Sequence, residues 1–289
     1  MRHFILPRPV AARPLRMFNP ATMARLVAPP RCMQRTSARV RRTLGAVDVA
    51  PIATAANERL GTTAWVRAQK QPGLYSIGAT VINGRMSGDQ LLALADLSEK
   101  YAGSEVRTTV MQNFVLPSVP QANLDIVLRE LSKLGLTVEA TNFWRGTVAC
   151  TGTEFCKLAI TETKGFSRWL VEEMEARLPG FDQQLQLHVT GCPNSCGQHW
   201  IADIGLEGKK IKQDGKLQDA WSFALGGALG VHAGLARTVN YRCLSDEVPE
   251  ALERLFGTYL KTRASDQNLR AWFAARSNDE LRAILEAAA

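Results

Sequence analysis

Four of the six cysteines stand in two close pairs whose spacing suits iron better than zinc. The first pair is Cys150 and Cys156, with five residues between them, and the second pair is Cys192 and Cys196, with three. A zinc knuckle typically has about two to four residues between its cysteines, so the first spacing is too long for it. A [4Fe–4S] cubane accepts such spacing because its irons sit at separate corners and take thiolates from different directions. These four residues are called the paired cysteines below.

Glycines surround the paired cysteines and would let the backbone approach a cluster closely. Gly152 lies within the first pair, and Gly191 and Gly197 flank the second pair. Glycine has no side chain to block such an approach, and the N–H groups nearby can point at cluster sulfurs. A predicted helix start close to Cys156 would also favour its thiolate form through the helix dipole.

Two other interpretations of the paired cysteines stay open, namely inert buried thiols and a zinc site. Cys32 and Cys243 have no neighbours of the same kind and fit ordinary buried cysteines best. Two tight clusters in the middle of a long chain indicate metal binding in a reducing compartment more than a disulfide framework, which belongs to short secreted domains.

The elements before the cysteines predict an α+β half-domain. Residues 74–84 alternate as a strand does, and Ser87 with Gln90 forms a capping box for the helix that follows. Strand, helix, strand and helix within about seventy residues form a ferredoxin-like, split βαβ sandwich. The predicted ranges are strands 74–84 and 105–117 and helices 87–103 and 121–136.

The elements around and after the cysteines predict an α/β domain that carries them. A long helix would place Cys156 in its first turn, and a hairpin would turn at Asp214–Gly215. The predicted ranges are helix 153–178, strands 184–191 and 199–208, and the hairpin 209–225, followed by two or three terminal helices in residues 246–263 and 266–288.

The charge lies in the N-terminal segment rather than in the body of the chain. Residues 1–47 contain ten Arg, no Lys and no acidic residue, although the whole chain has a net charge of +8. The remaining 25 basic residues face 27 acidic ones, so the body carries about −2, which argues against nucleic acid as a partner. No apolar run approaches the length of a membrane span, so no membrane partner is expected either.

Three domains are therefore expected. Residues 1–55 form a basic, disordered extension, residues 56–138 the half-domain and residues 139–289 the cysteine-bearing domain. The extension could be an organellar transit peptide, a nucleic-acid-binding arm, or the product of a misplaced start site on a longer gene, and we favour the third. The expected location is the cytoplasm, or an organelle if the extension is a transit peptide.

The cysteine motifs resemble those of a known family. C-x5-C followed by GCPNSCG resembles the signature of the siroheme-dependent nitrite and sulfite reductases. RxTxxQN at Arg107–Asn113, GGALG at 226–230 and IADIGLEG ending at Gly208 are also similar to that family. The resemblance covers roughly residues 64–280 and corresponds to the second of two repeats in full-length members.

The resemblance implies a [4Fe–4S] cluster held by the paired cysteines, with Cys196 also bridging to the siroheme iron and so taking part in catalysis. It implies an α/β domain for siroheme and cluster after the half-domain. Arg107, with Thr109 and Asn113 on the same strand face, could pair with a siroheme carboxylate, although a solvated surface strand explains Arg107 as well. Asn194 could bind cofactor or cluster, or be a plain turn residue.

The function implied is reduction of nitrite to ammonium with electrons from ferredoxin or a similar donor. CTGTEFCKLAITETK is more similar to ferredoxin-dependent nitrite reductases than to plant-type sulfite reductases. Assimilatory sulfite reduction, a precorrin-3B synthase-like reaction and a non-catalytic iron–sulfur electron-transfer module remain alternatives. The family's anion-gripping cations come mainly from the first repeat, so a homodimer or a missing N-terminal half would have to complete the site.

Overall fold

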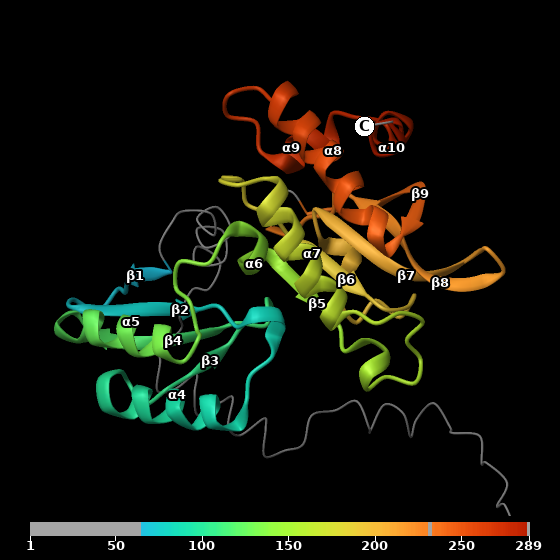
Figure 1. Ribbon diagram of the computed structural model, residues 1–289. Helices are drawn as coiled ribbons and strands as arrows, with labels where there is room; N and C mark the ends of the chain where they lie inside the picture. Colours follow the sequence, from blue (N-terminus) through green and yellow to red (C-terminus); the bar gives the residue numbers. More distant parts are fainter. Residues whose placement is uncertain (1–64, 231–232, 288–289) are drawn as a thin grey trace, which may run out of the picture. The chain divides into compact units, whose positions relative to one another are not determined.

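The computed structural model describes residues 65–230 and 233–287 (Figure 1). The predicted extension, residues 1–55, and Cys32 lie outside the described residues. The first described domain is a four-stranded antiparallel sheet in the order β1-β2-β4-β3, with two main helices. Its elements are β1 Val66–Ala68, β2 Leu74–Ala79, α4 Gly88–Tyr101, β3 Arg107–Thr108, β4 Phe114–Pro120 and α5 Leu124–Lys133.

The two helices of this half-domain form where the sequence predicts them. Ser87 accepts a hydrogen bond from the Gln90 amide, and the Gln90 side chain reciprocates, so the capping box of α4 is confirmed. Both helices face one apolar core, to which Leu94 of α4 and Leu131 of α5 contribute fully buried side chains. The ferredoxin-like, split βαβ architecture within an α+β fold is therefore confirmed.

The predicted strand 105–117 is wrong, because it divides into β3 and β4 around a tight turn. The Thr109 amide donates to the Asn113 carbonyl at 2.9 Å, and the Thr109 hydroxyl accepts from the Asn113 amide at 3.1 Å. Gln112 has a φ of 57°, in the left-handed region that tight turns use. Thr109 and Asn113 therefore face each other across a turn instead of alternating along one strand.

The second domain is built on a five-stranded mixed sheet in the order β5-β6-β7-β8-β9. The first three strands are parallel, and the last three run antiparallel to their neighbours. The β7–β8 hairpin turns at Asp214–Gly215 with positive φ at both residues, which confirms the prediction. The strands are β5 Thr147–Ala149, β6 Leu187–Thr190, β7 Ile204–Gln213, β8 Lys216–Leu225 and β9 Arg237–Leu244.

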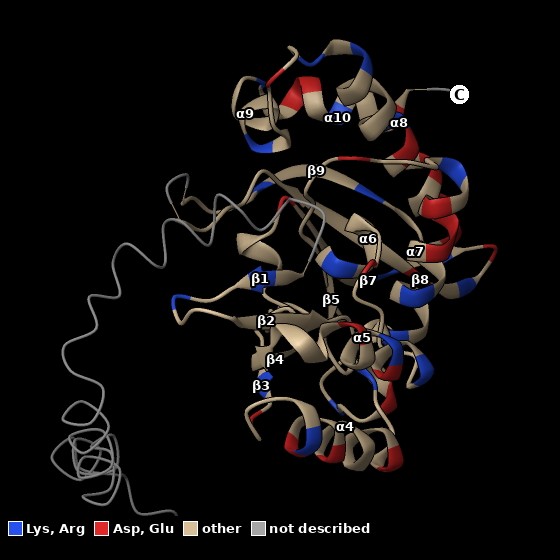
Figure 2. Cartoon of the chain, turned by 90° about the vertical axis from the view of Figure 1, so that its left-hand side faces the viewer, with Lys and Arg blue, Asp and Glu red and all other residues tan. Residues whose placement is uncertain are grey.

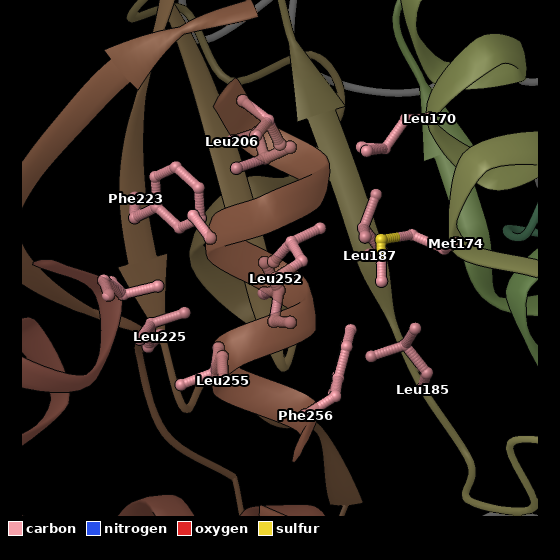
Figure 3. Close-up of a cluster of buried hydrophobic side chains, with 14 of the residues drawn as sticks. Leu170, Met174, Leu185, Leu187, Leu206, Phe223, Leu225, Leu252, Leu255 and Phe256 are labelled. Atoms are coloured by element: carbon pink, nitrogen blue, oxygen red, sulfur yellow. The ribbon is translucent and has the colours of Figure 1, made fainter. Parts of the chain in front are cut away.

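Helices cover this sheet and share its apolar core. Figure 3 shows side chains from α7, β7, β8 and α8 pointing toward one another, among them the fully buried Leu170, Leu206 and Phe256. Such burial stabilises by about 25 cal/mol per Å² of apolar surface removed from water. The helices are α6 Asn142–Gly146, α7 Lys164–Arg177, α8 Val248–Thr262, α9 Leu269–Ala274 and α10 Asn278–Glu286.

The predicted helix 153–178 begins too early, because α7 starts only at Lys164. The amides of Ile160 and Thr161 donate to the Gly191 carbonyl, at 2.7 and 3.3 Å, instead of to a preceding turn of helix. Cys156 therefore lies in a loop outside α7, and the helix dipole does not act on it as predicted.

Charges of both signs are interspersed over the described surface. Figure 2 shows segments of Lys and Arg beside segments of Asp and Glu along α4 and α8. None of the helices within the described residues is long and apolar enough to cross a membrane.

Candidate metal centre

The paired cysteines follow two neighbouring parallel strands at the same edge of the sheet. Strands β5 and β6 are in register, with Ala149 opposite Val189. Cys150 comes directly after β5, and Cys192 comes two residues after β6. In open α/β sheets, ligands bind outside the carboxyl ends of the strands, which is where both cysteine loops lie.

Gly191 joins the two cysteine loops. Its amide donates to the Cys150 sulfur at 3.2 Å, and its carbonyl accepts from Ile160 and Thr161. A Cβ added at Gly191 would lie 2.9 Å from the Thr161 carbonyl oxygen, too close for the present backbone. The glycine is therefore required for this close approach, and the N–H···S bond has the form expected around cluster sulfurs.

The paired cysteines differ in their access to solvent. Cys192 is buried, Cys150 and Cys156 are half-buried and Cys196 is exposed, and all four are free thiols. Within the described residues, no group of three or more His, Cys, Asp or Glu is placed to hold a single metal ion. A cubane makes a different demand, because each of its thiolates binds a separate iron. The thiol donor set and the N–H···S bond therefore fit a cluster better than a mononuclear site.

A buried lysine beside the first cysteine loop was missed by the sequence analysis. The Lys164 ammonium donates to the Asn83 carbonyl at 2.8 Å and to the Gln112 side-chain oxygen at 3.0 Å. Burial, and then the nearby Arg85 guanidinium, lower the pKa of Lys164, while Cys150 acts in the opposite direction. The signal available was a lysine at the start of an amphipathic helix, which usually indicates a solvated position.

The RxTxxQN turn also reaches the first cysteine loop, although not through the residues that we predicted. The Gln112 amide group donates to the carbonyl of Ala149, the residue before Cys150, at 2.9 Å. Thr163 supports the same loop by donating its hydroxyl hydrogen to the Cys150 carbonyl at 2.6 Å. Polar side chains from the half-domain and from the end of the loop thus fix the backbone at Cys150.

The predicted cofactor-binding residues other than cysteine are placed as follows. Arg107 is exposed and forms a bidentate pair with Glu105, at 2.6 and 3.1 Å. Asn113 is buried, and its side-chain oxygen accepts from the Val81 amide at 2.9 Å. Thr109 closes the turn described above, and Asn194 is exposed between the second pair. Their contacts with a cofactor stay predictions.

His188 provides a test of this region through pH. The residue is buried, its Nδ1 lies 3.1 Å from the Gln198 carbonyl oxygen, and burial lowers its pKa from 6.5 to about 4. Because the folded pKa is depressed, the stabilisation is complete above pH 6.5 and is lost as the pH falls toward 4. The loss should reach about 3 kcal/mol of unfolding free energy.

The measurement is urea unfolding between pH 7.5 and 4.5, on the wild-type protein and on His188→Leu. The variant should show a flatter pH dependence, because it lacks the imidazole that must be neutral in the fold. Identical pH dependence in the two proteins would contradict the assignment. Burial also lowers the pKa of His199. This residue is present in both proteins, so its contribution to the pH dependence cancels in the comparison.

A split βαβ half-domain, followed by a mixed sheet whose parallel strands end in paired cysteines, has the architecture of an iron–sulfur oxidoreductase domain. Residues 67–134 match the family described as the nitrite/sulfite reductase ferredoxin-like half domain, and residues 140–288 match the nitrite and sulphite reductase 4Fe-4S domain. The chain belongs to the nitrite and sulfite reductase family. Membership in this family implies a [4Fe–4S] cluster and siroheme as cofactors.

The curated relatives include both nitrite reductases and sulfite reductases. The chain is 38% identical over 215 residues to the assimilatory ferredoxin-dependent nitrite reductase of Haloferax mediterranei. The aligned residues cover 73% of this chain and 36% of the relative. It is 36% identical over 216 residues to sulfite reductase [ferredoxin] 2 of Mycolicibacterium paratuberculosis, covering 73% and 39%. The chain thus spans less than half the length of these relatives.

Solved structures share the fold. The NirA protein of Mycobacterium tuberculosis superposes with a TM-score of 0.71 at 34% identity, covering 76% of this chain and 41% of that one. Dissimilatory sulfite reductase I superposes with a TM-score of 0.63 over 94% of this chain and 91% of that one. At 13% identity, the second likeness shows the fold alone.

Proposed function

We propose that this chain is the cofactor-binding part of a reductase that converts nitrite to ammonium with electrons from ferredoxin. Residues 56–138 serve as its half-domain and residues 139–289 as its cluster- and siroheme-binding domain. The observation that carries the proposal is the joining of the two cysteine loops through Gly191 at the carboxyl ends of β5 and β6. The 38% identity to a nitrite reductase supports nitrite as the substrate.

The paired cysteines would hold the [4Fe–4S] cluster, and Cys196 would also help to hold the siroheme. Its exposure supports this role, because the thiol can be reached from outside the loop. When bound, the two cofactors supply one-electron transfer and an iron that binds the anion, for the six electrons and eight protons that nitrite needs to become ammonium and two waters.

The chain's own residues would prepare that chemistry. The Gly191 N–H spreads the negative charge of the Cys150 sulfur, and Lys164 adds a buried positive charge to the same region. Phe155 and Leu158, which flank Cys156, are 76% and 69% exposed and offer apolar surface for a macrocycle or for a further domain to cover. Arg107 would exchange Glu105 for a siroheme carboxylate.

Sulfite is the second candidate substrate, because several relatives at 36% identity are named ferredoxin-dependent sulfite reductases. The cationic residues that the resemblance assigns to a first repeat would come from a missing N-terminal half or from a second copy of this chain. The thiols needed for iron require a reducing compartment, which supports the cytoplasm or an organelle as the location.

The test is anaerobic purification of the full chain, followed by iron, acid-labile sulfide and a visible spectrum on one sample. The expected result is a cluster together with siroheme bands in the spectrum. With reduced ferredoxin as the donor, the protein should also reduce nitrite faster than sulfite. Faster sulfite reduction would select the second candidate. Cluster without siroheme would leave an electron-transfer module, and bound zinc would refute the cluster assignment.

A further inference from the structure

A buried ammonium group lies beside the first cysteine loop with only neutral hydrogen-bond partners. Lys164 is 9% exposed, and its ammonium donates to the Asn83 carbonyl and to the Gln112 side-chain oxygen. An ammonium has three N–H donors, so one of them has no acceptor among the described residues. A buried cation of this kind costs folding free energy and favours an anion nearby.

The neighbouring carboxylates are committed to other groups. Both carboxylate oxygens of Glu162 accept from the first amides of α7, those of Gly165 and Phe166, at 2.9 Å. Glu154 pairs with Arg85, which is itself a second cation near Lys164. The charge of the lysine is therefore not balanced by either carboxylate.

The anionic group that acts most on this lysine is a cysteine of the first pair. Burial, and then the Arg85 guanidinium, lower the pKa of Lys164, whereas Cys150 raises it and does so more than Glu162. The charges of the ammonium and of the Cys150 sulfur are therefore coupled.

Two hydrogen bonds fix the position of the ammonium relative to Cys150. The Gln112 side chain accepts from Lys164 at 3.0 Å and donates at 2.9 Å to the carbonyl of Ala149, the residue before Cys150. Thr163, the residue before Lys164, donates its hydroxyl hydrogen to the Cys150 carbonyl at 2.6 Å. One side-chain amide thus separates the ammonium from the backbone beside Cys150.

A fixed buried cation at this place changes the energetics of reduction. Reduction by one electron makes a cluster more negative by one charge, so a nearby cation stabilises the reduced form more than the oxidised form. Solvent and salt screen a buried charge much less than an exposed one. Net charge and surroundings are among the factors that set the potential of an iron–sulfur cluster.

We infer that Lys164 raises the reduction potential of the cluster held by the paired cysteines and so favours electron transfer from a ferredoxin-type donor. One electron leaves the reduced donor and enters the cluster, and no bond forms or breaks. Lys164 is not a catalytic residue, since it acts through its charge. This inference rests on the proposed function, because it requires the cluster.

The test is a potentiometric titration of the anaerobically purified full chain with dithionite, in which the EPR signal of the reduced cluster is followed. Lys164→Gln removes the charge and should disfavour reduction at least tenfold, which lowers the midpoint by about 59 mV for a one-electron couple. Lys164→Arg keeps the charge and should keep the wild-type midpoint. A purely structural role of Lys164 would not make the midpoint follow the charge.

Arg168→Gln is the matched control. It removes one positive charge four residues further along α7, from an exposed arginine that pairs with Glu172. Solvent screens this charge, so the midpoint should stay at the wild-type value. Gln112→Glu is a second test variant, because it places a carboxylate against the ammonium and leaves the lysine in place. Its midpoint should also fall at least tenfold in the reduction equilibrium.

The outcomes separate this inference from the proposed function. An unchanged midpoint in cluster-loaded Lys164→Gln, or an equal fall in Lys164→Gln and Lys164→Arg, would overturn the inference alone. Gln112→Glu decides the matter if Lys164→Gln does not hold its cluster. Loss of the cluster from both variants would assign the charge to cluster loading and would also overturn the inference. A wild-type chain without a cluster would overturn the proposed function, and the inference with it.

Discussion

Replacing Cys196 by serine is expected to remove most of the iron and acid-labile sulfide from the anaerobically purified protein. The expected wild-type content is about four of each per chain. A serine hydroxyl does not ionise near neutral pH and cannot replace the thiolate, so the iron content should fall at least tenfold. Iron and sulfide analysis, with the visible spectrum, measures the effect.

Cys243→Ala is the matched control for this substitution. Cys243 is 5% exposed in β9, and burial raises the pKa of its thiol to about 12, so it stays a protonated core residue. The control should keep its full iron content. Full iron content in Cys196→Ser, or equal loss in the two variants, would contradict the assignment of Cys196.

Replacing Phe256 by alanine is expected to lower the unfolding free energy by about 3–5 kcal/mol. The side chain is fully buried and projects from α8 into the core (Figure 3). Its ring lies 4.9 Å from that of Phe181 and 5.9 Å from that of Phe143. Neighbouring rings cannot collapse completely into the cavity that remains, so the loss exceeds that of transfer alone. Chemical denaturation at constant pH measures the change.

Leu260→Ala tests whether position in the core, rather than helix composition, causes the loss. Leu260 lies on the same helix and is 37% exposed, so its truncation should cost less than about 1.5 kcal/mol. Similar losses in the two variants would show that α8 does not pack as described.

Local sequence signals predicted much of the fold because local chemistry decides those elements. The capping box at Ser87 and the Asp214–Gly215 turn are set by residues within a few positions of each other, and both are confirmed. The start of α7 was not predictable in this way. It depends on the carbonyl of Gly191, which accepts hydrogen bonds from amides about thirty positions earlier in the chain. Only the folded chain brings these groups together.

The same distinction between local and long-range signals holds for the candidate site. The spacing of the paired cysteines and their glycines indicated the metal chemistry, and the structure places both pairs on adjoining loops. The partners of polar residues could not be predicted. Glu105 is only two positions from Arg107, yet either residue could have pointed elsewhere, and Lys164 finds its partners about fifty and eighty positions away.

Lys164 has a consequence for how the described domains come apart. Its ammonium is held by Asn83 and Gln112, both in the half-domain, while Asn83 also bonds the Lys164 carbonyl and the Ser167 hydroxyl. Pulling the half-domain away would leave these polar groups without partners and would loosen the backbone beside Cys150 at the same moment. Mechanical or thermal separation of the domains and opening of the cysteine loops should therefore be a single cooperative event, rather than two successive ones.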